Sequence, residues 1–149
     1  MRALHATVAL FVLTGILVAV TALADGRAPP RYQVIVHPSN RTTTVDRRFL
    51  EDAFLKKITR WPENDAVIRP VDLSPSSPAR RAFSDGVLNR SVEAVKGYWQ
   101  QRIFSGRDVP PPELDSDEDV VRYVLKYEGA VGYISGGASP GGSKVVEVR

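Results

Sequence analysis

Apolar residues recur along the chain at two different spacings, and the changes of spacing mark helices and strands. A compact β-rich run at 32–37 ends at a proline followed by two polar residues, which predicts a buried strand. From Thr44 onward apolar residues fall at helical spacing as far as Ile58, with charged residues on the opposite face. This pattern predicts an amphipathic helix, ended by Trp61–Pro62.

Capping residues predict three more helices. Ser77–Pro78 combines a preferred N-cap with a proline at the first helical position. Ser91 begins a longer helix in which Trp99 and Ile103 share one apolar stripe, and we expect Trp99 to be a core residue. Ser116, with acidic residues in the following turn, resembles a capping box, so that acidic run favours a helix start over a cation site.

Three further segments have strand character. The run at 66–73 predicts a strand whose internal Pro70 favours an edge position, and 130–135 and 144–148 predict the last two strands. Strands that alternate with helices indicate an α/β fold with a central sheet covered by helices. We expect a mixed sheet of about four strands.

The first 24 residues have the layout of a secretory signal peptide. One arginine precedes an apolar run at 7–20, and the small residues 22–24 form an A-x-A site. We predict cleavage after Ala24, a linker at 25–31, one domain at 32–149, and a periplasmic or secreted location. The alternative is an uncleaved membrane anchor, for which the apolar run is barely long enough.

Composition excludes several classes of function. The 149 residues suit one domain with a real core, and 20 basic against 17 acidic residues give a net charge of +3 without a basic stripe for nucleic acid. The chain has no cysteine and two histidines, of which only His37 follows the predicted signal. We therefore expect no cysteine or paired-histidine metal site, no cofactor, no catalytic residues and no enzymatic activity.

The order of the predicted segments resembles a known family. The stretches on which this resemblance rests are QVIVHPSN, FLEDAFLKK with the Trp-Pro of RWPEN, VIRPVDL, the serine-rich turn before Phe83, and EGAVGYIS. They resemble the second lobe of phosphate ABC transporter substrate-binding proteins, of the type 2 periplasmic-binding fold. The stretch SVEAVKGYWQQRIFSGRDVPPPEL is similar to short, single-lobe exported proteins of this kind. The resemblance covers about 32–134 and implies a single lobe of that fold.

The resemblance carries over little of the family's phosphate site. The family grips phosphate between two lobes, and the anion loop of its first lobe has no counterpart in this sequence. In the second lobe it uses an arginine and, four residues later, a serine followed by glycine and threonine. With Phe83 as the anchor, those positions hold Leu73, Ser77, Pro78 and Ala79. Only the serine is retained.

The stretch DLSPSSPARRAF, residues 72–83, therefore has two interpretations. It can be a simple helix cap, or it can hold an anion through the hydroxyls of Ser76 and Ser77, the backbone N–H groups of Ala79 and Arg80, and the Arg80 guanidinium. Because such a site is open to water, we expect at best millimolar affinity for phosphate.

Two functions follow, from different classes. The resemblance implies an exported, non-catalytic solute-binding-like protein. Its expected partners are phosphate or another oxyanion, and an ABC permease or another periplasmic or membrane protein. The alternative is a periplasmic protein-interaction module that no longer binds phosphate, since a single lobe exposes a surface that a second lobe covers.

Overall fold

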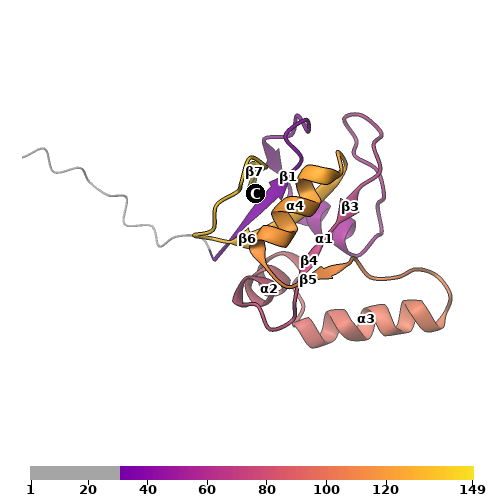
Figure 1. Cartoon of the computed structure of the whole chain (residues 1–149). Coiled ribbons are helices and arrows are strands. Elements are labelled where there is room, and N and C mark those ends of the chain that lie inside the picture. Colours follow the sequence, from indigo (N-terminus) through magenta and orange to yellow (C-terminus); the bar gives the residue numbers. More distant parts are fainter. Residues whose placement is uncertain (1–30) are drawn as a thin grey trace, which may run out of the picture.

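The computed structural model describes residues 31–149, drawn in colour in Figure 1. The expected signal peptide and nearly all of the expected linker lie outside these residues. The strands are β1 Tyr32–Val36, β2 Thr44–Val45, β3 Arg69–Pro70, β4 Asp72–Leu73, β5 Glu113–Leu114, β6 Ala130–Ser135 and β7 Lys144–Val148. The helices are α1 Arg47–Phe54, α2 Pro78–Phe83, the π-helix η1 Ser84–Leu88, α3 Val92–Phe104 and α4 Asp117–Lys126. Within this part of the chain, no helix is both long and apolar enough to span a membrane.

A mixed five-stranded sheet organises the fold, in the order β2-β7-β1-β6-β3. The central strand β1 pairs antiparallel with β6 and with β7, whereas β2 pairs parallel with β7 and β3 pairs parallel with β6. The short strands β4 and β5 form a separate parallel pair. The α/β class is confirmed, and Pro70 lies in an edge strand as predicted.

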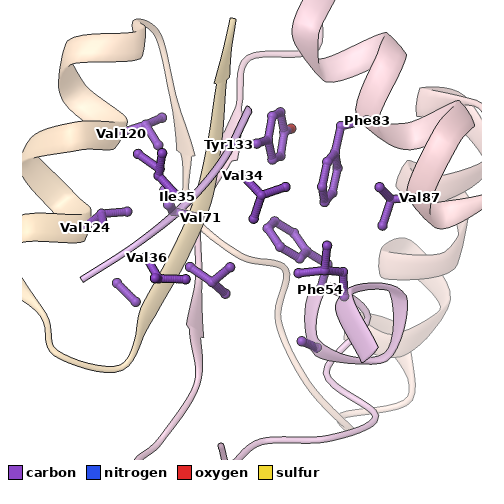
Figure 2. Close-up of a cluster of buried hydrophobic side chains, with 14 of the residues drawn as sticks. Val34, Ile35, Val36, Phe54, Val71, Phe83, Val87, Val120, Val124 and Tyr133 are labelled. Carbon is purple, nitrogen blue, oxygen red and sulfur yellow. The ribbon is translucent and has the colours of Figure 1, made fainter. Parts of the chain in front are cut away.

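The sheet separates two layers of core side chains (Figure 2). Successive residues of a strand point to opposite faces, so Val34 lies on the side of Phe54 and Phe83, and Ile35 lies on the side of α4 with Val120. All five side chains are at most 1% exposed. The alternation explains why β1 reads as a continuous apolar run, because helices cover both of its faces.

Aromatic rings join β6 to the helices on the first face. The ring of Tyr133 stacks on that of Phe83 with centroids 3.9 Å apart, and Phe83 lies 4.7 Å from Phe54. Trp61 donates its indole N–H to the carbonyl of Gly129 at 3.0 Å, which ties the loop after α1 to the start of β6. These contacts fix β6 against α1 and α2.

The predicted caps are confirmed. The side chains of Ser77, Ser91 and Ser116 each accept a hydrogen bond from a backbone N–H in the first turn of the helix that follows. Trp99 is 5% exposed and is a core residue, as predicted. Ile103, expected on the same buried stripe, is 50% exposed.

Two predicted elements were wrong in their extent. The helix expected from Thr44 to Ile58 begins at Arg47 and ends at Phe54, because Thr44 pairs in β2 and Lys56 adopts a left-handed φ of 52°. The strand expected at 66–73 is divided, since β3 pairs with β6 but β4 pairs with β5. A change of partner strand does not appear in the local pattern of apolar residues.

A glycine between α4 and β6 gives a test of this fold. A Cβ at Gly129 would overlap the backbone carbonyl of Val67, whereas a Cβ at Gly137 would meet no atom of the described residues within 4 Å. We expect Gly129→Ala to lower the free energy of unfolding by about 3 kcal/mol, because the clash is with backbone rather than with a flexible side chain. Gly137→Ala is the matched control and should leave stability within about 0.5 kcal/mol. Urea unfolding of both variants measures this, and equal stabilities would contradict the packing.

Candidate binding site at the serine turn and the α3 groove

The segment between β4 and α2 forms a tight turn, which we call the serine turn (residues 74–77). The backbone N–H of Ser77 donates to the carbonyl of Ser74 at 2.9 Å, and the hydroxyls of Ser74 and Ser76 lie 3.1 Å apart. The hydroxyl of Ser77 accepts from the N–H of Arg80 at 3.4 Å. The serine hydroxyls are therefore used inside the turn, and the helix-cap interpretation is confirmed.

The predicted anion-site residues are adjacent in the chain but differ in exposure. Ser76 is exposed and Ser77 is partly buried, whereas Ala79 and Arg80 are each only 2% exposed. The backbone of the serine turn thus brings all four positions together. The Arg80 guanidinium, however, lies in the interior, and the exposed arginine beside the turn is Arg81, which donates to the carbonyl of Ser76 at 3.1 Å. Anion binding at these residues stays a prediction.

Arg80 belongs to a buried polar cluster with Asp72 and Tyr133. Its guanidinium forms an ion pair with the Asp72 carboxylate, and both side chains are less than 5% exposed. The Tyr133 hydroxyl donates to the same carboxylate at 2.7 Å. It also accepts from the N–H of Leu73 at 3.3 Å and from Arg80 at 3.4 Å. These bonds join β4, α2 and β6 at one point.

Burial and neighbouring charges both shift the pKa values of the three side chains in this cluster. Desolvation raises the pKa of Asp72, and the neighbouring Arg80 cation opposes that rise. Desolvation lowers the pKa of Arg80, but the attraction of Asp72 outweighs it, so this pKa lies above its ordinary value. Desolvation, reinforced by the Asp72 carboxylate, raises the pKa of Tyr133 well above its ordinary value. Arg80 therefore stays charged and Tyr133 stays neutral near pH 7.

The cluster leaves little positive charge for a ligand at the serine turn. The charge of Asp72 compensates that of Arg80 at short range, and a second carboxylate, that of Glu113, lies 3.9 Å from the guanidinium. The Nε of Arg80 is buried and has no hydrogen-bond partner among residues 31–149. An anion at Ser76 would have to compete with Asp72 for this arginine.

The prediction from sequence missed Asp72 and Tyr133 as the partners of Arg80. A local signal does exist, because Arg80 precedes the buried Phe83 by three residues and so lies on the same side of α2. Asp72 and Tyr133 are 61 residues apart, and no local pattern connects them.

A groove of about 630 Å³ lies beside the cluster, between α3 and the proline-rich segment that leads to β5. We call it the α3 groove. Apolar residues form most of its wall, among them Val92, Val95, Trp99, Ile103, Pro110 and Pro111. Two acidic residues, Glu93 and Glu113, and two basic residues, Lys96 and Arg80, line the groove, so its charges are balanced. Such a surface suits an apolar partner better than a free anion. Between residues 31 and 149, no group of three or more metal-ligating side chains comes together.

Solved structures share this fold. The chain resembles a protein assigned as a phosphate ABC transporter substrate-binding protein, with bound phosphate, from Clostridium perfringens (TM-score 0.61, 24% identity, 81% of this chain and 47% of that one). An ABC-type phosphate transport receptor from Vibrio cholerae matches with a TM-score of 0.60, 20% identity, and coverage of 81% and 48%. PstS from Borrelia burgdorferi matches with a TM-score of 0.62, 17% identity, and coverage of 80% and 47%.

These similarities define the class of fold as that of phosphate-transport substrate-binding proteins, as the resemblance predicted. The chain spans about half the length of these structures, which agrees with a single lobe. No model of a known protein family matches the sequence, and no curated protein matches it significantly.

The buried ion pair gives a stability prediction. Arg80→Met should lower the free energy of unfolding by about 3 to 5 kcal/mol, because it leaves the Asp72 carboxylate buried without its cation. The double variant Asp72→Asn with Arg80→Met should regain more than half of that loss, since an amide in place of the carboxylate brings no charge and can still accept from Tyr133. Urea denaturation of the single and double variants tests this. Strictly additive losses would show that the two side chains are not coupled.

The neutral tyrosine predicts a decrease of stability in base. The unfolded chain releases the Tyr133 proton near pH 10, whereas the folded chain, with its raised pKa, keeps it. The unfolded state then binds fewer protons, so this contribution is complete below about pH 10 and is lost as the pH rises further. We expect the stability of Tyr133→Phe to fall less steeply between about pH 9 and 11 than that of the parent. Equal slopes in urea titrations would contradict the raised pKa.

Proposed function

We propose that this chain is an exported, non-catalytic binding module built on one lobe of the phosphate-binding fold. In this proposal its contact with phosphate or another oxyanion is weak, and its main binding surface is the α3 groove. The observation that carries the proposal is the internal ion pair of Arg80 with Asp72, which withdraws from the serine turn the arginine that an anion site there requires.

The remaining groups at the serine turn support only a weak oxyanion contact. Ser76 and Arg81 are exposed, but the hydroxyl of Ser76 is within hydrogen-bond distance of Ser74 and the guanidinium of Arg81 already donates to a backbone carbonyl. Pro78 has no N–H to offer at the first position of α2. An oxyanion bound there would remain hydrated on one side and would be screened by salt.

The α3 groove supports the alternative function, a protein-interaction module. An apolar wall with balanced charges gains its binding energy from the removal of apolar surface from water. Exposed apolar surface continues beyond the groove at the end of α3, where Phe104 is 91% exposed. An exposed surface of this kind commonly marks a protein partner.

Transport and export remain parts of the proposal. The similar structures are described as phosphate transport proteins, and an ABC permease is the partner that a transport role would require. Export with cleavage after Ala24 rests on the pattern of the first residues. Intact-mass measurement of the protein recovered from the periplasm tests it, and a retained Met1 would contradict cleavage.

Calorimetric titration with inorganic phosphate at low salt tests the binding proposal. We expect a dissociation constant of about 1 mM or weaker, which corresponds to about 4 kcal/mol. Arg81→Ala and Ser76→Ala should remove the weak heat without changing the melting temperature, because both side chains are exposed. The matched control is Arg48→Ala, which changes an exposed arginine on α1. Micromolar binding by the parent would overturn the proposal.

A further inference from the structure

A buried hydrogen-bond donor in the wall of the α3 groove has no partner in the folded chain. The Nε of Arg80 is buried, and no acceptor among residues 31–149 bonds to it. The ion pair with Asp72 and the hydrogen bond to Tyr133 both use Nη1 of the same guanidinium. Buried N–H groups are nearly always hydrogen-bonded, so an unpartnered one at the wall of a groove points to an acceptor supplied from outside the chain.

The unpartnered Nε belongs to one edge of the Arg80 guanidinium. Nε–H and Nη2 lie on the same edge of this planar group, which can hold an acceptor with two parallel N–H groups. On that edge the Glu113 carboxylate lies 3.9 Å from Nη2, which is too far for a hydrogen bond. The Glu113 side chain is 48% exposed, so water solvates its charge. Because Arg80 and Glu113 both line the α3 groove, they form one polar position in its wall.

This polar position presents a donor beside an acceptor. Arg80 can only donate hydrogen bonds, and the ionised Glu113 can only accept them. In an extended peptide the N–H and C=O of one residue point to the same side, as they do in the hydrogen-bonded pairs of an antiparallel sheet. One residue of such a peptide can therefore accept from Arg80 and donate to Glu113. A ligand carboxylate fits less well, because Asp72 and Glu113 already place two negative charges beside Arg80.

The rest of the groove suits the apolar side chains of such a peptide. Figure 1 shows the chain turning back after α3 toward β5, and apolar residues line the groove from both segments. Trp99 and Ile103 come from the helix, and Pro110 and Pro111 come from the segment before β5. The 13 residues of α3 extend over about 20 Å, which is the length of about six residues of an extended chain.

We propose that an extended, uncharged, apolar peptide segment of a partner protein binds in the α3 groove. The C=O of one of its residues accepts from the Nε–Nη2 edge of Arg80, and the N–H of the same residue donates to Glu113. These two contacts fix the position of the peptide, and the burial of apolar side chains supplies most of the affinity. The inference rests on the proposed function, whose main binding surface is this groove, and it names the chemistry of the partner.

Selection from a display library of random six-residue peptides tests this inference. The target is the full chain, expressed with its own N-terminal segment and recovered after export. We expect the enriched peptides to be uncharged and rich in apolar residues. The most enriched one, synthesised with acetylated and amidated ends, should bind with a dissociation constant in the micromolar range, measured by fluorescence anisotropy. Failure to enrich any peptide overturns the inference, as does enrichment of acidic peptides.

A variant of the apolar wall places the bound peptide in the groove. Ile103 lines the groove and is 50% exposed, so Ile103→Ala removes part of the wall without opening the core. It should weaken binding of the selected peptide about fivefold and leave the melting temperature unchanged. Leu125→Ala, which shortens an exposed apolar residue on α4, is the matched control and should not change binding. Equal binding by the parent and Ile103→Ala would show that the peptide lies elsewhere.

The polar position is tested by removing each side of it. Glu113→Ala should weaken binding about tenfold, whereas Glu128→Ala, which removes an exposed glutamate outside the groove, should not. Methylation of the peptide nitrogen that donates to Glu113 should weaken binding by the parent but have little further effect on Glu113→Ala. The double variant Asp72→Asn with Arg80→Met should also lose binding, and its urea denaturation curve verifies that it is folded.

The outcomes separate this inference from the proposed function. Equal binding of the selected peptide by the parent, Glu113→Ala and the double variant overturns the inference but keeps the groove as the binding surface, provided that Ile103→Ala weakens binding. Phosphate titration measures the contact at the serine turn independently, so a failure there is distinguishable from a failure in the groove.

Discussion

The buried ion pair between Asp72 and Arg80 is the interaction on which the rest of this structure depends. It joins a two-residue strand to a six-residue helix, and the Tyr133 hydroxyl connects both to the central sheet. Neither β4 nor α2 is long enough to be stable by itself. A charge in this interior is costly unless its partner is present, so each side chain constrains the position of the other.

This use of Arg80 has a consequence for binding. A cation can stabilise the fold by compensating a buried carboxylate, or it can attract a ligand at the surface, but it cannot do both fully at once. Asp72 is nearly fully buried and is not solvated by water. Its electrostatic attraction to Arg80 is therefore stronger than that of a hydrated oxyanion at the serine turn. The contact that stabilises the fold is therefore also the reason why we propose only a weak oxyanion contact at the serine turn.

The features that sequence predicted are those that depend on neighbouring residues. The caps at Ser77, Ser91 and Ser116 and the strand β6 are set within a few positions, and the structure confirms them. The start of α1 and the division of 66–73 depend on which distant strand pairs with each segment. The serine turn shows the same limit. Its residue types are visible in the sequence, but the inward direction of Arg80 beside it is set by Asp72 and by Tyr133, which is 53 residues away.

The helix α3 shows how a surface can be specified apart from the core. Trp99 on the inner side packs the helix against the domain, so the residues on the outer side do not contribute to the core. A phenylalanine exposed to water and a glycine inside a helix each cost free energy there, and no contact among residues 31–149 offsets that cost. Apolar contact would recover both costs and is nearly independent of ionic strength, whereas oxyanion binding weakens as salt is added. In the proposed function, the binding energy of this lobe therefore comes from apolar area along α3 rather than from charge at the serine turn.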